Sequence, residues 1–312
     1  MASGRFAPSP TGDLHLGNLR TALLAWLLAR STAGAFLVRM EDLDRVQASV
    51  EHEGSQLRDL SALGLDWDGE VVRQSERFDR YEDAIATLAR AGLTYPCYCT
   101  RREIREAANA PHDGPMPDGA YPGTCRTLSQ AEQHRREAAG RRPALRLRAE
   151  VGEVTVVDDL LGPVTAVVDD VVLRRTDGVP AYNLAVVVDD AAQRIEQVVR
   201  ADDLASSAPR QRHLAELLGL PPVRYAHVPL VLAASGMRLA KRDGAITLAH
   251  QARRGLDAVD VLSVLAASVG LAEPGVRVRA RDLVDRFDPN CLPTTPWTAD
   301  PALLATASEP ID

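Results

Sequence analysis

The segment LRTALLAWLLARS, residues 19–31, places apolar residues at helical spacing around its whole circumference. A helix that is apolar on every side has no face for solvent, so this segment predicts a buried helix. A short strand ending near Ala7 precedes it, and the strand-like run AFLVRMEDLD follows it. Strand, helix and strand in this order favour a parallel sheet with the helix packed against it.

The rest of the chain divides by composition. SVEHEGSQLRDLSALGL predicts an amphipathic helix, and the Pro-, Gly- and Cys-containing residues 95–142 predict an insertion between sheet elements. Residues 145–200 hold apolar runs such as VTAVVDDVVLRR and predict a strand-rich region. Helical patterns return near residue 208. The Pro-rich tail FDPNCLPTTPWTAD predicts irregular structure that packs against the rest of the protein.

A chain of 312 residues is long enough for two domains, and its 46% hydrophobic and 25% charged residues are typical of soluble proteins. It has no run of about 18 uncharged apolar residues, and its first residues lack the basic-then-apolar layout of a secretory signal. We therefore expect a cytoplasmic protein without a membrane partner. The net charge of −7 means that a nucleic acid would need a local basic face. Short arginine-rich runs at 101–102, 135–136 and 141–148 either contact phosphates or lie on solvated helix faces.

The loop FAPSPTGDLHLGN, residues 6–18, lies where a ligand crevice is expected in a parallel sheet, between the first strand and the following helix. The helix N-terminus there attracts phosphates, Gly12 and Gly17 allow close approach to the backbone, and His15 can donate to a phosphate oxygen. A tight turn with a surface histidine is the alternative interpretation.

A second loop, SGMRLAKRDGA, places Lys241 and Arg242 after the apolar run YAHVPLVL, where a strand should end. Two loops at strand ends, one with His15 and one with Lys241, predict a site that closes on a triphosphate from two sides. A basic loop alone is usually only solvated.

The cysteines lie at 97, 99, 125 and 291. Three in a cluster and one remote do not suggest a disulfide framework. Three thiolates suit a tetrahedral structural zinc with a fourth donor, although buried free cysteines are also common.

Five motifs in fixed order resemble the glutamyl branch of the class I aminoacyl-tRNA synthetases. PSPTGDLHLGNLRTAL resembles the HIGH-type signature, and RLAKR resembles the KMSKS-type loop. RMEDLD, RRTDGVPAYNLAVVVDDA and VVRADDL lie between them and resemble the amino-acid pocket segments. Only 70 residues follow Arg242, where glutamyl-tRNA synthetases continue through a long anticodon-binding region, and the tail DRFDPNCLPTTPW adds to the likeness. The chain thus resembles the short glutamyl-Q tRNA(Asp) synthetase family.

The resemblance implies an α/β fold: a Rossmann-type class I synthetase catalytic domain with a zinc-containing insertion and a short helical C-terminal region. Residues 1–94 would form the first half of the catalytic domain and 95–180 an insertion with the zinc site and a β-rich acceptor-binding part. Residues 181–243 would form the second half with the KMSKS-type loop, and 244–312 the helical C-terminal region.

The implied reaction has two steps. The carboxylate of L-glutamate attacks the α-phosphate of ATP, supplied with Mg²⁺, without tRNA, giving glutamyl-adenylate and pyrophosphate. A hydroxyl of the queuosine base in the anticodon of tRNA(Asp) then takes the glutamyl group. Such adenylyl transfer depends on positioning and charge neutralisation. We expect a monomer.

The motif match implies a role for each site residue. ATP would be bound by His15, Gly17, Asn18 and Lys241, with His15 and Lys241 catalytic. Glutamate would be bound by Arg5, Ser9, Glu41, Tyr182 and Arg200, in which the arginines supply cations and Glu41 the anion. Alternatively, Arg200 pairs with Asp202 or Asp203, and Glu41 with arginines near Arg39.

The short family also implies one structural Zn²⁺ held by Cys97, Cys99, Cys125 and a tyrosine. Tyr121 of YPGTC is the expected fourth ligand in preference to His112, and an ordinary hydrophobic role for Tyr121 is the alternative.

Three positions depart from the family signatures. Asn18 replaces the second histidine of the HIGH-type motif, Arg238 the first lysine of the KMSKS-type loop, and Ala240 its serine. Arg238 loses a compact ammonium and Ala240 a hydroxyl donor, which predicts slower catalysis.

Two rival functions remain at this point. One is a short glutamyl-tRNA synthetase that charges the 3′ end of tRNA(Glu). The other is a non-catalytic RNA-binding or regulatory module on a synthetase fold, against which the joint presence of Lys241, His15, Arg5 and Glu41 argues.

Overall fold

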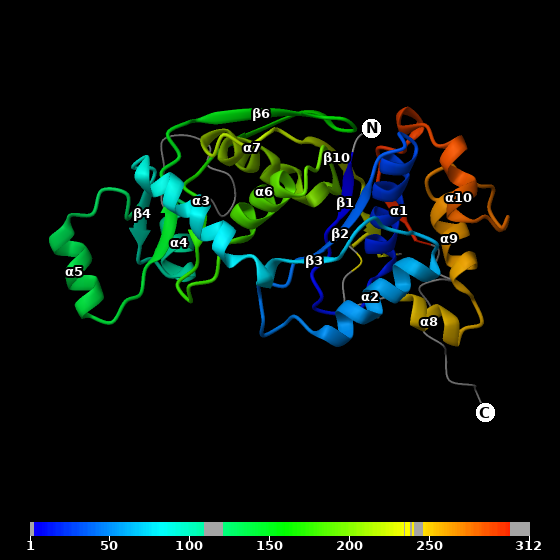
Figure 1. The fold of residues 1–312 in the computed structure, drawn as a ribbon, viewed down its shortest axis with the longest axis horizontal. Helices are drawn as coiled ribbons and strands as arrows, with labels where there is room; N and C mark the ends of the chain where they lie inside the picture. Colours follow the sequence, from blue (N-terminus) through cyan, green and yellow to red (C-terminus); the bar gives the residue numbers. More distant parts are fainter. Residues whose placement is uncertain (1–2, 109–120, 234, 238, 240–245, 300–312) are drawn as a thin grey trace.

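The computed structural model describes residues 3–108, 121–233, 235–237, 239 and 246–299. Within them, the main sheet has seven strands in the order β3-β2-β1-β9-β10-β6-β7 (Figure 1). In chain order these are β1 (Gly4–Phe6), β2 (Phe36–Met40), β3 (Val72–Arg73), β6 (Glu153–Asp158), β7 (Gly162–Val167), β9 (Gln197–Ala201) and β10 (Arg224–Val228).

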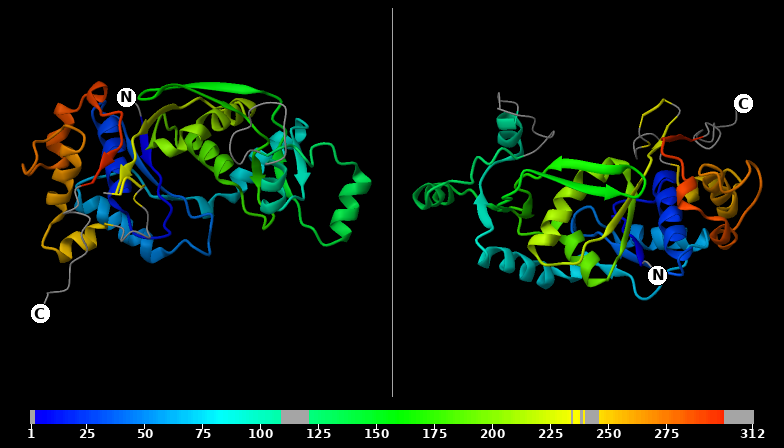
Figure 2. Two further views of the ribbon diagram at one scale, coloured as in Figure 1. Left: turned by 180° about the vertical axis from the view of Figure 1, so that it is seen from behind. Right: turned by 90° about the horizontal axis from the view of Figure 1, so that it is seen from above.

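The main sheet is parallel except at one edge, which confirms the sheet predicted from the sequence. β1 pairs in parallel with β2 and with β9, and β10 pairs in parallel with β9 and β6. β7 returns antiparallel to β6 and forms a hairpin that packs against α7 (Ala208–Leu217), as Figure 2 shows.

The chain changes direction across the sheet at β1. From β1 it moves to β2 and β3 on one side, whereas the later strands β9 and β10 lie on the other side. In open parallel sheets, ligands bind outside the carboxyl ends of strands at such a switch point. The fold therefore predicts a crevice at the ends of β1 and β9.

The helix predicted from residues 19–31 is α1 (Leu16–Arg30), and it is buried as expected. It contacts β1, β2 and β9 and also α9 (Ala258–Ala267), so its apolar circumference is covered by the sheet and by a C-terminal helix. Leu19, Leu23 and Leu27 have no exposed surface. This burial on two sides explains why the segment lacks a polar face.

Within the described residues, five further helices lie around the main sheet and at one end of the molecule. They are α2 (Val50–Ala62), α3 (Phe78–Arg90), α6 (Tyr182–Ala192), α8 (Leu248–Arg253) and α10 (Ala280–Leu283), with the short 3₁₀ turns η1 (Gln74–Glu76), η2 (Asp202–Ser207), η4 (Val284–Arg286) and η5 (Pro289–Cys291). α8, α9 and α10 gather at one end (Figure 1). The tail after α10 is largely irregular, as predicted, but β12 (Trp297–Thr298) pairs with β11 (Val231–Leu232).

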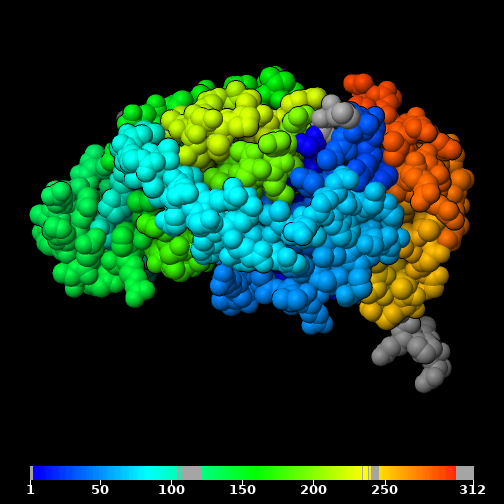
Figure 3. Space-filling model, viewed as in Figure 1, coloured from blue at the N-terminus to red at the C-terminus, as the bar shows by residue number. Residues whose placement is uncertain are grey.

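A small antiparallel sheet lies toward the opposite end of the molecule. It contains β4 (Thr94–Cys97), β5 (Ala144–Leu147) and β8 (Val172–Arg174), accompanied by α4 (Arg101–Ala108) and α5 (Gln130–Ala138). Figure 3 shows that these residues protrude on the side away from the C-terminal helices. The two helices within residues 95–142 were not predicted, because their short sequences hold few apolar residues.

The prediction of a strand-rich region over residues 145–200 is wrong in its last part. Residues 182–192 form α6, and the strands before it are shared between the main and the small sheet. The run LAVVV favours a strand by composition, but α6 contacts α3, α7 and β8 and buries apolar residues on several sides. A short apolar run with no polar face does not distinguish a buried strand from a buried helix.

No helix within the described ranges is long and apolar enough to span a lipid bilayer.

Two valines allow a matched test of this core. Val38 of β2 has no exposed surface, whereas Val46 is 95% exposed. Val38→Ala removes two buried methyl groups and leaves a cavity, so it should lower the free energy of unfolding by about 1.5–3 kcal/mol. Val46→Ala should change it by less than about 0.5 kcal/mol. Urea denaturation measures both, and equal effects would contradict the placement of β2 in the core.

Candidate active site

A cavity of about 500 Å³ lies at the carboxyl ends of β1 and β9, at the switch point of the sheet. Most of the residues predicted for glutamate and ATP line it: Arg5, Ser9, His15, Asn18, Glu41, Tyr182 and Arg200. They come from β1, the loop after it, the start of α1, the end of β2, the start of α6 and β9. The sheet topology therefore brings together residues that are far apart in the sequence.

His15 caps the N-terminus of α1. Its Nδ1 accepts hydrogen bonds from the backbone N–H groups of Gly17 (3.1 Å) and Asn18 (3.3 Å), and the Asn18 side chain accepts from the His15 N–H. Because Nδ1 is an acceptor, a neutral His15 ring carries its proton on Nε2. Two N–H groups expected to face phosphate are thus used by the imidazole.

The structure gives a steric reason for glycine at position 17, in addition to the predicted close approach of a ligand. A Cβ atom at Gly17 would lie 3.0 Å from His15 Cε1 and 3.1 Å from His15 Nδ1. The glycine therefore makes room for the imidazole that caps the helix. Gly17 lines a smaller neighbouring cavity with His15, Val231 and Leu239.

A buried charge network lies beside the cavity. Asp190 accepts hydrogen bonds from Arg5 Nε (3.1 Å) and Arg39 (2.7 Å), and Arg39 also lies 3.5 Å from Glu41. Burial alone would raise the pKa of Asp190, but the charges of Arg39 and Arg5 hold it below its usual value. Burial raises the pKa of Glu41 despite Arg39 and Arg5. Glu41 therefore pairs with Arg39 itself rather than with arginines near it, while it also lines the cavity.

Asp189 anchors the network on its other side. Its carboxylate accepts hydrogen bonds from Arg77 (2.6 Å), Tyr81 (2.8 Å) and Gln74 (2.9 Å), and it is fully buried. Arg39, Asp189 and Asp190 were not predicted from the sequence as site residues. The sequence does contain a signal for them. Asp189 and Asp190 end an apolar run, and carboxylates that are buried need cationic partners.

Arg200 is held by neutral groups. Its Nε donates to His227 Nε2 at 2.9 Å, and its terminal nitrogens donate to Gln211 Oε1 (2.8 Å) and the Leu204 carbonyl (3.3 Å). The Tyr182 hydroxyl is 3.5 Å away. Among the described residues, no ion pair joins Arg200 to Asp202 or Asp203, so the predicted alternative pairing is not formed.

One further residue that was not predicted from the sequence holds the loop between β1 and α1. Gln56 of α2 is buried and donates to the carbonyls of Ser9 (3.1 Å) and Gly12 (2.7 Å). A glutamine on the buried face of an amphipathic helix was the signal for this contact. Lys241, Arg238, Ala240 and His112 lie outside the described residues.

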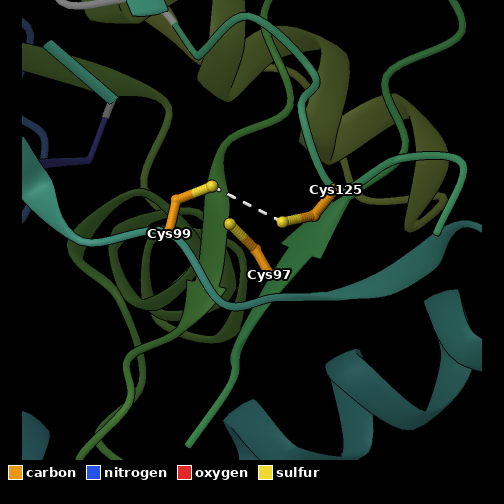
Figure 4. A group of neighbouring side chains, drawn as sticks. All are labelled: Cys97, Cys99 and Cys125. Carbon is orange, nitrogen blue, oxygen red and sulfur yellow. Dashed lines mark hydrogen bonds between the residues drawn. The ribbon is translucent and has the colours of Figure 1, made fainter. Parts of the chain in front are cut away.

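Cys97, Cys99 and Cys125 form a cluster whose sulfur atoms lie within 4.8 Å of one another (Figure 4). The Tyr121 oxygen is 3.3 Å from the Cys97 sulfur and 3.7 Å from that of Cys99, and it accepts from the Cys125 N–H at 2.7 Å. Hydrogen bonds from Cys97 and Tyr121 lower the pKa of Cys125 to about 6. Cys291 is exposed and apart from this cluster.

The cluster has the dimensions of a tetrahedral zinc site. Zn–S bonds of about 2.3 Å place two sulfur ligands about 3.8 Å apart. The Cys99 and Cys125 sulfur atoms are 3.5 Å apart, and the tyrosine oxygen lies at similar distances. The Arg146 guanidinium stacks 3.7 Å from the Tyr121 ring centroid, which brings a cation next to the cluster.

Comparison with known proteins agrees with these features. Residues 2–273 match the family described as tRNA synthetases class I (E and Q), catalytic domain. A Nocardia farcinica protein named glutamyl-Q tRNA(Asp) synthetase is 61% identical over 95% of this chain and 92% of its own length. Glutamate–tRNA ligase 2 of Syntrophus aciditrophicus is 39% identical over 85% of this chain and 57% of its own length.

A solved structure supports the fold. The glutamate tRNA ligase of Elizabethkingia meningosepticum superimposes with a TM-score of 0.81 at 25% identity, covering 97% of this chain and 68% of that protein. The likeness extends over almost the whole of this chain.

The charge network generates a stability prediction. Asp190→Asn leaves Arg5 and Arg39 without their shared carboxylate, so it should lower the free energy of unfolding by about 3 kcal/mol or more. The matched control Glu216→Gln removes one partner of the exposed pair with Arg212 and should cost less than about 1 kcal/mol. Urea denaturation at neutral pH measures both.

The pH dependence of this difference has a defined sign. Because the folded pKa of Asp190 is depressed, its stabilisation is fully present above the unfolded value of about 4 and is lost as pH falls through the lower folded value. The wild-type chain and Asp190→Asn should therefore converge in stability at acid pH. A constant difference down to about pH 2 would contradict an ionised Asp190.

Proposed function

The chain belongs to the glutamyl-Q tRNA(Asp) synthetase branch of the class I glutamyl- and glutaminyl-tRNA synthetases, and from this we propose that it activates L-glutamate with ATP and transfers it to queuosine in tRNA(Asp). The observation that carries the proposal is the cavity at the switch point of the sheet, where two arginines and one glutamate converge. A cavity with both signs of charge suits a zwitterionic amino acid with an extra carboxylate.

In the first step, a carboxylate oxygen of glutamate attacks the α-phosphorus of ATP, and the bond to the pyrophosphate oxygen breaks. Arg5 and Arg200 would bind carboxylate, Glu41 the ammonium group, and Ser9 and Tyr182 would donate hydrogen bonds. These roles are supported by the shared cavity. Holding the two reactants in line supplies most of the acceleration that such a reaction needs.

The phosphates of ATP, which arrives with Mg²⁺, would lie at the start of α1. His15 would donate to phosphate through Nε2, next to Asn18. Lys241 would neutralise the charge that develops on pyrophosphate. Lys241 is the only lysine in the chain, so no second ammonium group can replace it.

The acceptor RNA would occupy a second cavity of about 1090 Å³, which shares Ser9, Glu41 and Tyr182 with the first. Its lining includes Arg101, Arg141, Arg142, Arg146 and Arg175. A chain with net charge −7 needs such a local basic surface to bind phosphates. The transfer forms an ester between the glutamyl carbonyl carbon and a queuosine hydroxyl, and AMP leaves.

We further propose one structural Zn²⁺ bound by Cys97, Cys99, Tyr121 and Cys125. The metal would join the end of β4 to residues 121–125 and so stabilise the region that lines the second cavity. The three domain boundaries at 94, 180 and 243, the monomeric state and the cytoplasmic location stay predictions of the sequence and its resemblance.

Isotope exchange tests the first step. The wild-type chain should exchange labelled pyrophosphate into ATP with L-glutamate and without RNA. Lys241→Met should lower kcat by about 100-fold or more, because it removes the cation for the leaving pyrophosphate. Arg212→Met, on an exposed face away from the cavity, is the control and should retain activity. Exchange that requires tRNA would favour a glutamyl-tRNA synthetase, and no exchange would favour a binding module.

Transfer of labelled glutamate tests the second step. Label should reach tRNA(Asp) only when it carries queuosine, and periodate, which cleaves the cis-diol of the modified base, should abolish transfer. Label on tRNA(Glu) instead would overturn the proposed acceptor.

Metal analysis tests the zinc site. Wild-type protein and Cys291→Ser should retain about one zinc per chain after dialysis, whereas Cys125→Ser should lose it because three donors hold zinc weakly. Tyr121→Phe keeps the ring under Arg146 but removes the oxygen, so it should release zinc to a chelator faster. Elemental mass spectrometry measures the content. Zinc retained in Cys125→Ser, or absent from the wild type, would contradict the site.

A further inference from the structure

Arg200 ends a chain of three buried side chains that starts at Asp158. Asp158 Oδ2 lies 2.6 Å from His227 Nδ1, and His227 Nε2 lies 2.9 Å from Arg200 Nε. His227 has no exposed surface and Asp158 is 3% exposed. His227 is not among the residues that line the cavity, whereas Arg200 is. The histidine therefore acts on the cavity only through the arginine.

The donors fix the tautomer of His227. A guanidinium can only donate, so His227 Nε2 must be the acceptor, and Nδ1 then carries the proton and donates to Asp158. The Tyr225 ring stacks on the imidazole at 5.7 Å between centroids and 12° between planes. Both edges and one face of the ring are therefore held.

Asp158 is itself fixed by the backbone. Its Oδ1 accepts from the N–H groups of Leu160 (3.0 Å) and Leu161 (2.9 Å), and the His227 N–H lies 3.2 Å from both Oδ1 and Oδ2. Oδ2 also faces the imidazole. Burial alone would raise the pKa of Asp158, but the hydrogen bonds from His227, Leu161 and Leu160 lower it below its usual value. The ionised carboxylate keeps the proton on His227 Nδ1.

The partners of Arg200 differ in charge from those of Arg5. Arg5 donates to the Asp190 carboxylate, so much of its charge is neutralised within the protein. The partners of Arg200 are an imidazole, the amide oxygen of Gln211 and a backbone carbonyl. Neutral acceptors orient the guanidinium without cancelling its charge.

We propose that His227 is a positioning residue for Arg200: locked by Asp158 in the Nδ1-protonated tautomer, it orients the guanidinium as a neutral acceptor and reserves its charge for a carboxylate of bound glutamate. The inference rests on the proposed function, because it takes glutamate as the ligand of this cavity. A carboxylate at position 227 would orient Arg200 equally well but would neutralise it.

A matched pair of substitutions separates orientation from charge. In His227→Gln the amide oxygen accepts from Arg200 and the amide nitrogen donates to Asp158, so the KM for glutamate in pyrophosphate exchange should stay within about 3-fold of wild type. The double variant Asp158→Asn with His227→Glu has the same shape with a negative charge beside Arg200, because the asparagine amide donates to the introduced carboxylate and leaves it ionised, and it should raise that KM about 10-fold or more. In both variants the KM for ATP should change less than about 2-fold, because Arg200 is not among the residues proposed to bind ATP.

Asp158→Asn is a second variant that leaves both His227 and Arg200 in place. The N–H groups of Leu160 and Leu161 keep the amide oxygen at the Oδ1 position, so the amide nitrogen faces His227 Nδ1 and drives the ring proton to Nε2. Two donors then oppose each other at Arg200, and the KM for glutamate should rise about 10-fold. A purely structural role would instead lower activity at unchanged KM.

Three outcomes decide the inference. Equal KM values in His227→Gln and in the double variant Asp158→Asn with His227→Glu, or a parallel rise in the KM values for glutamate and ATP, would overturn it. Titration calorimetry with L-glutamate repeats the comparison without catalysis. If the wild-type chain binds glutamate but does not exchange pyrophosphate, the proposed function fails while the variants still test His227. If it does not bind glutamate, both proposals fail.

Discussion

Asp190 links three elements of the fold, because it lies in α6 and accepts hydrogen bonds from Arg5 of β1 and Arg39 of β2. All three side chains are buried, and an isolated buried charge is far more costly than a paired one. The network therefore fixes α6 against the carboxyl ends of the central strands. Tyr182, at the start of the same helix, reaches the cavity as a result. The geometry of the pocket thus depends on charges that are satisfied before any ligand binds.

The parts of the fold that the sequence reveals are those with local signals. The apolar residues around the whole circumference of residues 19–31 identify α1, and the order of strand and helix identifies the parallel sheet. The helix α6 was missed because its apolar run has no polar face, so only its packing between α3 and α7 decides its conformation. The hydrogen bonds of Gln56 to the loop were missed for a related reason, since they join residues far apart in the chain.

Site residues were predictable by resemblance, but their partners were not. Arg5, Glu41 and Arg200 were identified from motifs, and the structure places them in one cavity. Motifs do not reveal that Arg5 is neutralised by Asp190 while Arg200 is held by His227 and Gln211. Likewise, motifs do not reveal that a Cβ atom at Gly17 would lie 3.0 Å from the His15 ring. Such distinctions depend on distances between side chains that meet only in the fold.

A guanidinium that keeps its charge inside a small cavity attracts any anion that fits. Chloride, sulfate and phosphate from a buffer would therefore compete at Arg200 with the glutamate proposed to bind there. Screening by salt depends only on ionic strength, but this competition depends on the size and hydration of the particular ion. Two buffers of equal ionic strength but different anions should therefore give different apparent affinities for glutamate.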